Sequence, residues 1–341
     1  MMSHLMRAAV AEQFNQPLSI CDVPIPSPAP DQVLVRLAAS GVCHTDIHAV
    51  RAEWPLKPRL PLIPGHEAVG FISACGENVK HLREGDRVGV FWLNSACGIC
   101  EFCTSKRETL CLKQKNTGYS LNGTFAEYCV VSGDYAVPLP QGDPYKLAPI
   151  MCAGVTTYKG IKETGVKPGE WIAISGVGGI GHLAVQYAKA LGLQVVALDI
   201  DDDRLRLATQ LGADIVVNAQ TEFPVSRVTR VTGGVHGALI TAVSPKAFEQ
   251  GLGMLRRGGT CVLVGIPPGS FALSIFDTVV KGLTTRGSII GSRQDLKEAL
   301  EFVSSGSVSA QIEVRPLNMV NQAIDAILQR QIRGRIVLDL N

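Results

Sequence analysis

The feature that most constrains the fold is an alternation of apolar runs and amphipathic stretches in the middle of the chain. Three apolar runs occupy residues 171–175, 195–199 and 215–218. Between them, residues 180–191 and 204–211 carry apolar side chains at helical spacing. The runs are apolar throughout, which is typical of strands covered on both faces. This series predicts an α/β fold with a parallel, doubly wound sheet.

A glycine-rich turn follows the first of these strands directly and opens the first helix. Glycine there permits a tight turn, close approach of the backbone to a pyrophosphate, and close packing of helix against sheet. The helix N-terminus would stabilise the phosphate charge. The position of the turn therefore predicts a dinucleotide site. Its residues fit the pattern G-x-G-x-x-G and are Gly176, Val177, Gly178, Gly179, Ile180 and Gly181.

An acidic residue ends the second predicted strand. Asp199 stands eighteen residues after Gly181, where a carboxylate accepts hydrogen bonds from the ribose hydroxyls of adenosine. A 2′-phosphate would be repelled there, so the sequence favours NAD over NADP. The alternative that Asp199 caps the following helix stays open, although residues 201–203 are better placed for that role.

The first part of the chain differs from the middle in composition and patterning. It is rich in proline, glycine and short β-branched runs such as 32–37 and 87–91, which predict short strands of a twisted, largely antiparallel unit. The tail is mixed again, and we expect it to fold back onto this unit. The predicted domains are residues 1–153 with 291–341, and residues 154–290.

Charge and hydropathy exclude several classes of function. The 341 residues include 32 Lys and Arg against 30 Asp and Glu, a balance unsuited to a nucleic-acid or anionic-membrane surface. No apolar run approaches the ~18–20 residues of a membrane span, and the start of the chain lacks the pattern of a secretory signal. We therefore expect a cytoplasmic protein that binds neither nucleic acid nor membrane.

Four of the ten cysteines lie within fifteen residues, in a lobe spanning about residues 94–112. They are Cys97, Cys100, Cys103 and Cys111. Four soft ligands in a tight loop are typical of a closed tetrahedral zinc site, which stabilises a fold and leaves no position for substrate. An iron–sulfur cluster uses the same ligands and stays open as an alternative. Four other cysteines lie singly, and we expect them to be small buried hydrophobic residues: Cys21, Cys75, Cys129 and Cys261.

A second set of candidate ligands is dispersed along the chain. It comprises the segment 43–48 (CHTDIH), the segment 65–67 (GHE) and Cys152 at the end of the first predicted domain. A single histidine or cysteine is more often a core residue than a ligand. The spacing alone therefore leaves both interpretations open.

Together these motifs resemble the zinc-dependent medium-chain alcohol dehydrogenases, and most closely the tetrameric microbial ethanol dehydrogenases. The signature GHE-x2-G-x5-G-x2-V is met at every fixed position from Gly65 to Val79. The four-cysteine lobe, CHTDIH, MCAG at 151–154 and GVGGIG follow in the family's order, so the resemblance covers essentially the full chain. It implies a GroES-like, largely antiparallel catalytic domain and a Rossmann cofactor domain.

The resemblance also implies a set of zinc ligands. Cys43, His66 and Cys152 would hold a catalytic zinc whose fourth position is open to water or alcohol. Glu67 would lie beside the metal and exchange with the open position. Asp46 would accept a hydrogen bond from His66 and fix its tautomer.

The implied reaction is the reversible oxidation of an alcohol to an aldehyde. Zinc lowers the pKa of the alcohol, and the resulting alkoxide passes hydride to the nicotinamide of NAD. Thr45 would relay the proton through the nicotinamide ribose to His48, although a solvated surface role for His48 stays open. His44 and Arg335 would bind the cofactor pyrophosphate, and a histidine there would make the affinity for the cofactor pH-dependent.

Substrate size and assembly follow from the same resemblance. Trp54 and Trp92 match pocket positions of small-alcohol members and would narrow the pocket toward ethanol-like primary alcohols, unless both are plain core residues. Two zinc ions per chain and a homotetramer are implied. Polyol, benzyl-type and formaldehyde dehydrogenases of the same superfamily are the main alternatives. A zinc-lobe interaction or redox-sensor protein is a remote one, because the cysteine lobe holds two basic residues against two acidic ones.

Overall fold

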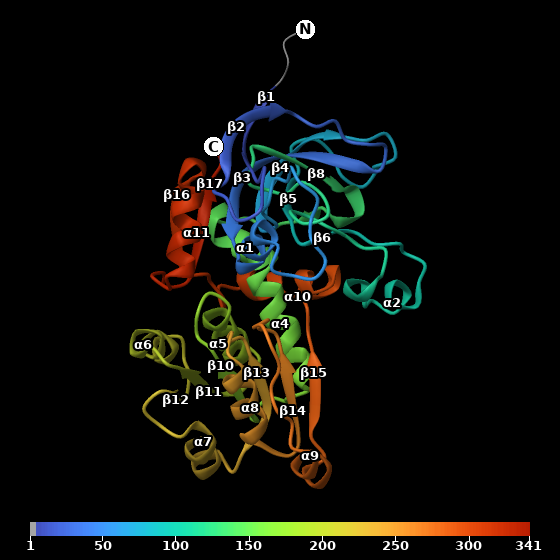
Figure 1. Cartoon of the computed structure of the whole chain (residues 1–341). Coiled ribbons are helices and arrows are strands. Elements are labelled where there is room, and N and C mark those ends of the chain that lie inside the picture. Colours follow the sequence, from blue (N-terminus) through green and yellow to red (C-terminus); the bar gives the residue numbers. More distant parts are fainter. Residues whose placement is uncertain (1–4) are drawn as a thin grey trace. The chain divides into compact units, whose positions relative to one another are not determined.

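A computed structural model describes residues 5–341, and the chain divides into two compact units (Figure 1). The first unit comprises residues up to Cys152 together with Ser292–Leu300 and Ala310–Asn341. The second comprises Ala153–Gly291 and Glu301–Ser309. This division differs from the predicted one at residues 301–309, which the prediction places in the first domain, and by one residue each at Ala153 and Gly291.

The first unit is built on a seven-stranded sheet in the order β16-β17-β3-β4-β5-β9, with β8 pairing with β3. Strands β16 and β17 pair in parallel, and the other pairs are antiparallel. The tail therefore returns beside β3, and the expected antiparallel unit is confirmed. The strands are β3 (Gln32–Val42), β4 (Ala68–Cys75), β5 (Arg87–Val90), β8 (Tyr128–Ser132), β9 (Val137–Pro138), β16 (Ile312–Pro316) and β17 (Arg335–Asp339).

Two small antiparallel sheets and several short helices complete this unit. The sheets pair β1 (Leu5–Val10) with β2 (Ser19–Pro24) and β6 (Leu93–Ser95) with β7 (Lys115–Asn116). The helices are α1 (His44–Arg51), α2 (Glu101–Thr104), α3 (Pro144–Leu147) and α11 (Val320–Leu328), with single 3₁₀ turns at Glu108–Leu110, Gly133–Tyr135, Ala148–Met151 and Leu317–Met319. Helix α10 (Arg293–Ser304) begins in this unit and ends in the second.

The second unit is a parallel sheet of six strands in the order β12-β11-β10-β13-β14-β15. This confirms the doubly wound α/β prediction. Its strands are β10 (Trp171–Ser175), β11 (Gln194–Asp199), β12 (Ile215–Asn218), β13 (Val235–Ile240), β14 (Leu255–Leu263) and β15 (Thr284–Gly287). Its helices are α4 (Ala153–Thr164), α5 (Gly181–Ala190), α6 (Asp202–Gln210), α7 (Pro224–Thr232), α8 (Pro245–Gly253) and α9 (Ile275–Lys281).

Helix α5 explains why residues 301–309 belong to the second unit. Its sequence predicts one apolar stripe, yet even Gln186 is buried. The Gln186 side chain donates to the carbonyl of Ser309 (3.1 Å) and accepts from the backbone N–H of the same residue (2.9 Å). The ring of Phe302 lies 5.7 Å from that of Tyr158 and 5.9 Å from that of Tyr187. Side-chain contacts across more than a hundred residues thus hold this segment.

The structure also tests the predicted burial of the four single cysteines and the expected absence of a membrane span. Cys129 and Cys261 are buried, as expected, but Cys21 and Cys75 are only half-buried. The prediction is wrong for this second pair because Cys21 lies in a two-stranded sheet and Cys75 is the last residue of β4. Within residues 5–341, no helix has the length and apolar character needed to cross a membrane.

Candidate metal centres and cofactor site

The first candidate metal centre forms around the start of α1. Cys43 is buried, precedes the helix in extended conformation, and donates its backbone N–H to the carboxylate of Asp46 (2.9 Å). The other oxygen of Asp46 accepts from Gly65 N–H (3.0 Å) and lies 2.8 Å from His66 Nδ1. One buried carboxylate therefore fixes both the backbone of Cys43 and the imidazole of His66.

The structure brings four predicted ligands together. The ligand atoms of Cys43, His66, Glu67 and Cys152 all lie within 4.8 Å of one another. His66 Nε2 and Oε2 of Glu67 are buried without a hydrogen-bond partner. A buried polar atom without a partner costs about 1–3 kcal/mol. A histidine held by a carboxylate through one nitrogen and unpartnered at the other is typical of a metal ligand, and two thiolates with one imidazole fit an open zinc site.

Charge coupling within this cluster favours the metal-binding form of one cysteine. The hydrogen bond from Cys152 lowers the pKa of Cys43 well below its usual value, with His66 acting in the same direction against the effect of burial. Burial alone would lower the pKa of His66, but Asp46 and Cys43 outweigh it and raise this pKa. The thiolate is the form of cysteine that binds metal.

Glu67 is held by an arginine from the last strand. Arg335, at the start of β17, is buried and donates from Nη2 to Oε1 of Glu67. Burial raises the pKa of Glu67 to about 7, although Arg335 opposes the shift. We expected Arg335 at a cofactor pyrophosphate; the structure shows its Nη2 on Glu67 and its Nε buried without a partner.

The second candidate metal centre is the four-cysteine lobe. The sulfurs of Cys97, Cys100, Cys103 and Cys111 lie within 4.8 Å of one another, and no disulfide joins them. Sγ of Cys103 is 3.5 Å from that of Cys100 and 3.9 Å from that of Cys97. Zinc–sulfur bonds of about 2.3 Å in a tetrahedron place sulfurs about 3.8 Å apart. Backbone N–H groups of Ile99 and Cys100 lower the pKa of Cys97 to about 6. The lobe therefore fits a closed zinc site.

An ion pair anchors this lobe. Glu108, between the third and fourth cysteines, is buried, and Arg293 is half-exposed. Nε of Arg293 donates to both oxygens of Glu108 (3.0 and 3.3 Å), and Nη2 donates to the second (3.0 Å). The guanidinium also lies over the ring of Tyr135, 4.3 Å from its centroid. Sequence reasoning counted Glu108 only toward the lobe's charge, and no local signal points to a partner 185 residues away.

Both predicted pocket tryptophans lie close to the first centre. Trp92 is buried, and its ring meets that of His66 edge-on at 5.3 Å. Trp54 meets Trp92 edge-on at 6.3 Å, and its Nε1 is buried without a partner. Tyr119, which the sequence did not single out, packs against both rings at 5.3 and 5.5 Å. An aromatic wall thus adjoins the cluster.

The remaining predicted residues of the first unit lie on α1. Thr45 and His48 are half-buried and three residues apart, so they share a face of the helix. His44 is exposed, and its ring centroid is 6.3 Å from that of His48. Partial desolvation, with a contribution from Arg335, lowers the pKa of His44. Its neutral form therefore dominates near pH 7.

In the second unit, the glycine turn between β10 and α5 shows why glycine is needed. Gly176 has φ +94°, and a Cβ there would lie 2.8 Å from the backbone nitrogen of Ala242. A Cβ on Gly181 would lie 1.8 Å from the carbonyl oxygen of Gly176. A Cβ on Gly178 would make only an ordinary contact, with the Arg204 side chain at 3.7 Å. Packing therefore requires glycine at positions 176 and 181 but not at position 178.

Asp199 ends β11 beside this turn and is buried. Its carboxylate accepts backbone hydrogen bonds from Val177 (2.7 Å), Ile200 (2.8 Å) and Asp201 (3.2 Å). Helix α6 is capped by Asp201, so the alternative that Asp199 is the cap is wrong. Arg204, which the sequence analysis did not single out, lies 3.8 Å from Asp199. The available signal was a basic residue in the first turn of the helix that follows Asp199.

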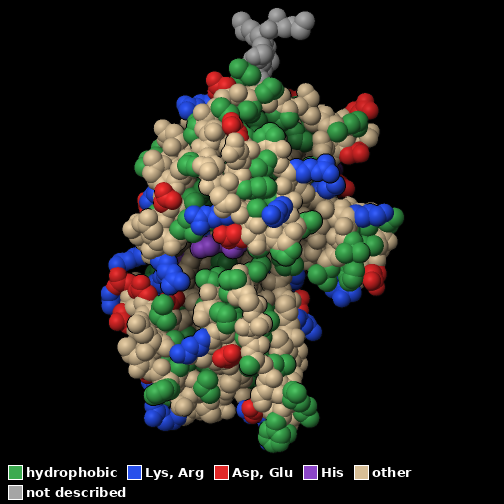
Figure 2. Space-filling view, in the orientation of Figure 1, with side chains coloured by type: hydrophobic (Ala, Val, Ile, Leu, Met, Phe, Trp, Pro, Cys, Tyr) green, Lys and Arg blue, Asp and Glu red, His purple; other side chains and the backbone are tan. Residues whose placement is uncertain are grey.

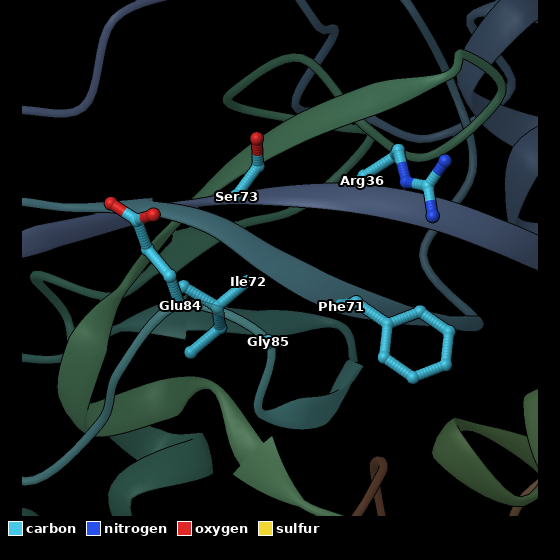
Figure 3. A pocket seen from close by; sticks show the side chains of 6 residues that line it. All are labelled: Arg36, Phe71, Ile72, Ser73, Glu84 and Gly85. Carbon is cyan, nitrogen blue, oxygen red and sulfur yellow. The ribbon is translucent and has the colours of Figure 1, made fainter.

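A groove of about 430 Å³ on the sheet of the first unit holds none of these residues. Figure 3 shows the Glu84 carboxylate and the Arg36 guanidinium at opposite ends of it. It is open to solvent and is not part of either candidate centre. Its lining residues are Arg36, Phe71, Ile72, Ser73, Glu84 and Gly85.

Comparison with known proteins agrees with this geometry. Residues 29–141 match an alcohol dehydrogenase GroES-like domain, and residues 179–305 match a zinc-binding dehydrogenase domain. An alcohol dehydrogenase of Moraxella sp. (strain TAE123) is 54% identical over 335 residues, covering 98% of this chain and 99% of the relative. One of Geobacillus stearothermophilus is 53% identical over 337 residues, covering 98% and 100%.

The fold agrees as well. The crystal structure of the alcohol dehydrogenase from the hyperthermophilic archaeon Aeropyrum pernix has a TM-score of 0.90 at 32% identity, covering 98% of this chain and 99% of that one. Matches to both domains and to full-length relatives coincide with both cysteine-containing clusters. The chain therefore belongs to the zinc-dependent medium-chain alcohol dehydrogenase family.

Proposed function

We propose that this alcohol dehydrogenase oxidises small primary alcohols such as ethanol to aldehydes, reversibly and with NAD as the hydride acceptor. Two zinc ions per chain are proposed, one in the cluster of Cys43, His66 and Cys152 and one in the four-cysteine lobe. The observation that carries the proposal is the buried, unpartnered Nε2 of His66 among two cysteines and Glu67. The alternatives are polyol, benzyl-type and formaldehyde dehydrogenation.

Each residue of the first centre has a distinct part in this proposal. A zinc ion there would supply a Lewis acid that lowers the pKa of the substrate hydroxyl. Asp46 keeps His66 in the tautomer whose Nε2 is free to bind metal. Arg335 holds Glu67 beside the ligands, where Glu67 is proposed to exchange with the open position. These groups are buried, so the ligand atoms are shielded from bulk solvent.

The proton of the alcohol needs a separate route. We assign it to Thr45 and His48, which lie three residues apart on α1. The Thr45 hydroxyl accepts the proton while its own proton passes on toward His48, and the imidazole of His48 releases a proton to solvent. Neither residue is a candidate metal ligand, so this role is independent of the cluster.

Cofactor choice rests on Asp199 and the glycine turn. Three backbone N–H groups hold the Asp199 carboxylate beside the glycine turn, where dinucleotide-binding folds of this kind bind the adenosine ribose. A 2′-phosphate would meet that charge, although Arg204 at 3.8 Å offsets part of it. We propose NAD on this ground, with His44 and Arg335 assigned to the pyrophosphate.

The aromatic wall supports a preference for small substrates. Trp92 and Trp54 occupy the space beside His66 with large, mutually packed rings. Tyr119 packs behind both and restricts their movement. A short unbranched alcohol fits such a site better than a bulky one.

A homotetramer is proposed from the edge of the second unit. Strand β15 (Thr284–Gly287) is the last strand of its sheet and is fully exposed. Hydrophobic side chains gather over α9 (Figure 2), including Ile275, Phe276 and Val279. An unpaired edge beside an exposed apolar patch is typical of an assembly surface. Sedimentation at micromolar concentration tests this; a monomer would contradict it.

The proposed activity is tested by the near-ultraviolet absorbance of reduced nicotinamide, with purified protein and a panel of alcohols. We expect a faster rise with ethanol and propanol than with benzyl alcohol or sorbitol, and a much faster rise with NAD than with NADP. A rise only with sorbitol or benzyl alcohol would replace the substrate assignment by one of the alternatives. No rise with any alcohol, in protein holding two zinc ions, would overturn the proposal.

A further inference from the structure

An acidic side chain that the proposed reaction does not use lies against His48. The carboxylate Oε2 of Glu53 is 2.5 Å from His48 Nδ1. Glu53 lies beyond the end of α1, and the chain turns back toward the helix because Ala52 adopts a left-handed conformation (φ 52°). The backbone N–H of Glu53 then donates to the carbonyl of His48 itself (3.1 Å).

The turn after α1 places Ala52 in an unfavourable backbone conformation. A non-glycine residue is less stable in the left-handed region than in the right-handed helical region, because its Cβ crowds the backbone. Helices commonly end in such a residue, but glycine is the usual choice. Alanine at this position therefore indicates that the direction of the following segment is held by other contacts.

Those contacts fix the imidazole on its face as well as on its edge. The next residue, Trp54, stacks on the ring of His48 with centroids 5.3 Å apart and planes inclined by 27°. Trp54 is in turn packed by Trp92 and Tyr119, and the Tyr119 hydroxyl donates to the carbonyl of Leu56. His48 is therefore clamped by two consecutive side chains of a segment that is itself anchored.

The edge contact determines which nitrogen of His48 is basic. A carboxylate only accepts hydrogen bonds, so in the neutral imidazole the proton is on Nδ1 and the lone pair is on Nε2. Nε2 of His48 has no hydrogen-bond partner among residues 5–341. When Nε2 takes up a proton, the imidazolium is paired with the Glu53 carboxylate; when Nε2 releases it to solvent, the starting state returns.

We propose that Glu53 is a positioning residue for proton release, which fixes the tautomer of His48 and holds the orientation of its ring. The inference rests on the proposed function of His48 as the proton outlet. The titratable groups beside the His48 ring are Glu53, from the segment after α1, and His44, from α1 itself. Of these two groups only Glu53 is anionic, so Glu53 supplies the negative charge beside the His48 ring.

The first test reads the imidazole directly and does not require catalysis. Nitrogen NMR of ¹⁵N-histidine-labelled protein, with His48→Gln to assign the signal, reports the tautomer and titration of His48. We expect the Nδ1–H tautomer in the wild type. In Glu53→Gln the Nδ1–H tautomer should no longer dominate, because the amide offers the ring a donor as well as an acceptor. An Nε2–H tautomer in the wild type, or an undiminished Nδ1–H tautomer in Glu53→Gln, would overturn the inference.

The second test reads the role in turnover. In Glu53→Gln the pH profile of alcohol oxidation should differ from that of the wild type, with zinc content and the KM for ethanol unchanged. Glu53→Asp should restore part of the wild-type profile. In the His48→Gln background, Glu53→Gln should have no further effect, because its action passes through His48. An equal effect in both backgrounds would overturn the role.

A matched control removes a surface charge elsewhere in the same unit. Glu313 is exposed and paired with Arg315 on β16, and Glu313→Gln should leave the profile unchanged. A wild-type protein that oxidises no alcohol would overturn the proposed function, and with it the role of Glu53. The NMR result would still decide whether Glu53 sets the tautomer, so the two failures are distinguishable.

Discussion

Replacement of Asp46 by asparagine tests how the first metal cluster is held in shape. Asp46 is 1% exposed and accepts three hydrogen bonds, from Cys43 N–H, Gly65 N–H and His66 Nδ1. Asparagine has nearly the same volume but only one acceptor oxygen, so its NH₂ group must face at least one of these donors. The substitution therefore leaves a buried donor unpaired without creating a cavity.

The magnitude follows from the number of donors lost. If the asparagine oxygen stays toward Gly65 and His66, only the Cys43 N–H loses its partner; if the amide turns over, two donors lose theirs. A hydrogen bond to a charged group contributes about 1.5–3 kcal/mol, and an unpaired buried donor costs about 1–3 kcal/mol. We expect Asp46→Asn to lower the free energy of unfolding by about 2–5 kcal/mol. Zinc affinity should fall about 10–100-fold, as when the partner of a ligating histidine is removed.

Two assays measure these quantities on the same protein. Competition with a chromogenic chelator gives the affinity of the more weakly bound zinc, and denaturant unfolding gives the stability. Asp325→Asn, on the exposed face of α11, is the control for loss of a charge. If Asp46→Asn bound zinc within twofold of the wild type and lost less than about 0.5 kcal/mol, the argument that Asp46 organises the cluster would be refuted.

Four further predictions concern separate parts of the molecule. Glu108→Gln should lower the free energy of unfolding by about 1–3 kcal/mol in denaturant titrations, because the half-exposed Arg293 loses a charged partner; unchanged stability would contradict this. Trp92→Ala should raise kcat/KM for benzyl alcohol relative to ethanol at least about tenfold; an unchanged ratio would refute the pocket role. Asp199→Ala should reduce the preference for NAD over NADP by about 10–100-fold in initial-rate assays, since like charges repel the 2′-phosphate; a preserved preference would speak against it. The pKa of Cys97 lies at about 6 in the metal-free lobe, so its thiolate is present above that pH and is lost below it. Zinc uptake by the metal-free lobe should therefore be weaker at pH 5 than at pH 8, and equal uptake at both values in metal analysis would contradict this.

The second unit was the part of the fold most open to prediction from sequence. Strands β10 and β12 match the predicted runs 171–175 and 215–218 to the residue. Strands covered on both faces are apolar throughout, and glycines mark their ends. The positions of these strands can therefore be predicted from the local sequence. Residues 301–309 were misassigned because their place depends on Gln186, far away in the chain.

The candidate site was less open to prediction from the residues alone. Cys43, His66 and Cys152 come from three separate segments, and only the family motif connected them. Spacing could not show that Asp46 binds two of those segments at once, because this requires β3 and β4 to be paired.

Contacts that depend on one backbone angle, or on residues far apart in the chain, could not be predicted from the sequence. Glu53 is visible in the sequence, but its contact with His48 depends on the left-handed conformation of Ala52. The pair of Glu108 and Arg293 joins residues 185 positions apart. Neither leaves a periodic or local signal.

The central claim is that the buried cluster of Cys43, His66 and Cys152 binds the zinc on which NAD-linked alcohol oxidation depends. The most direct measurement is the initial rate of NAD reduction by ethanol as zinc is restored to chelator-treated protein, with bound metal counted in the same samples. The account predicts two zinc ions per chain at saturation and a rate that rises with occupancy of one of them. In Cys152→Ser, the lobe zinc should remain and the rate should be lost. A full rate in metal-free protein, or in Cys152→Ser with only the lobe zinc bound, would contradict the account.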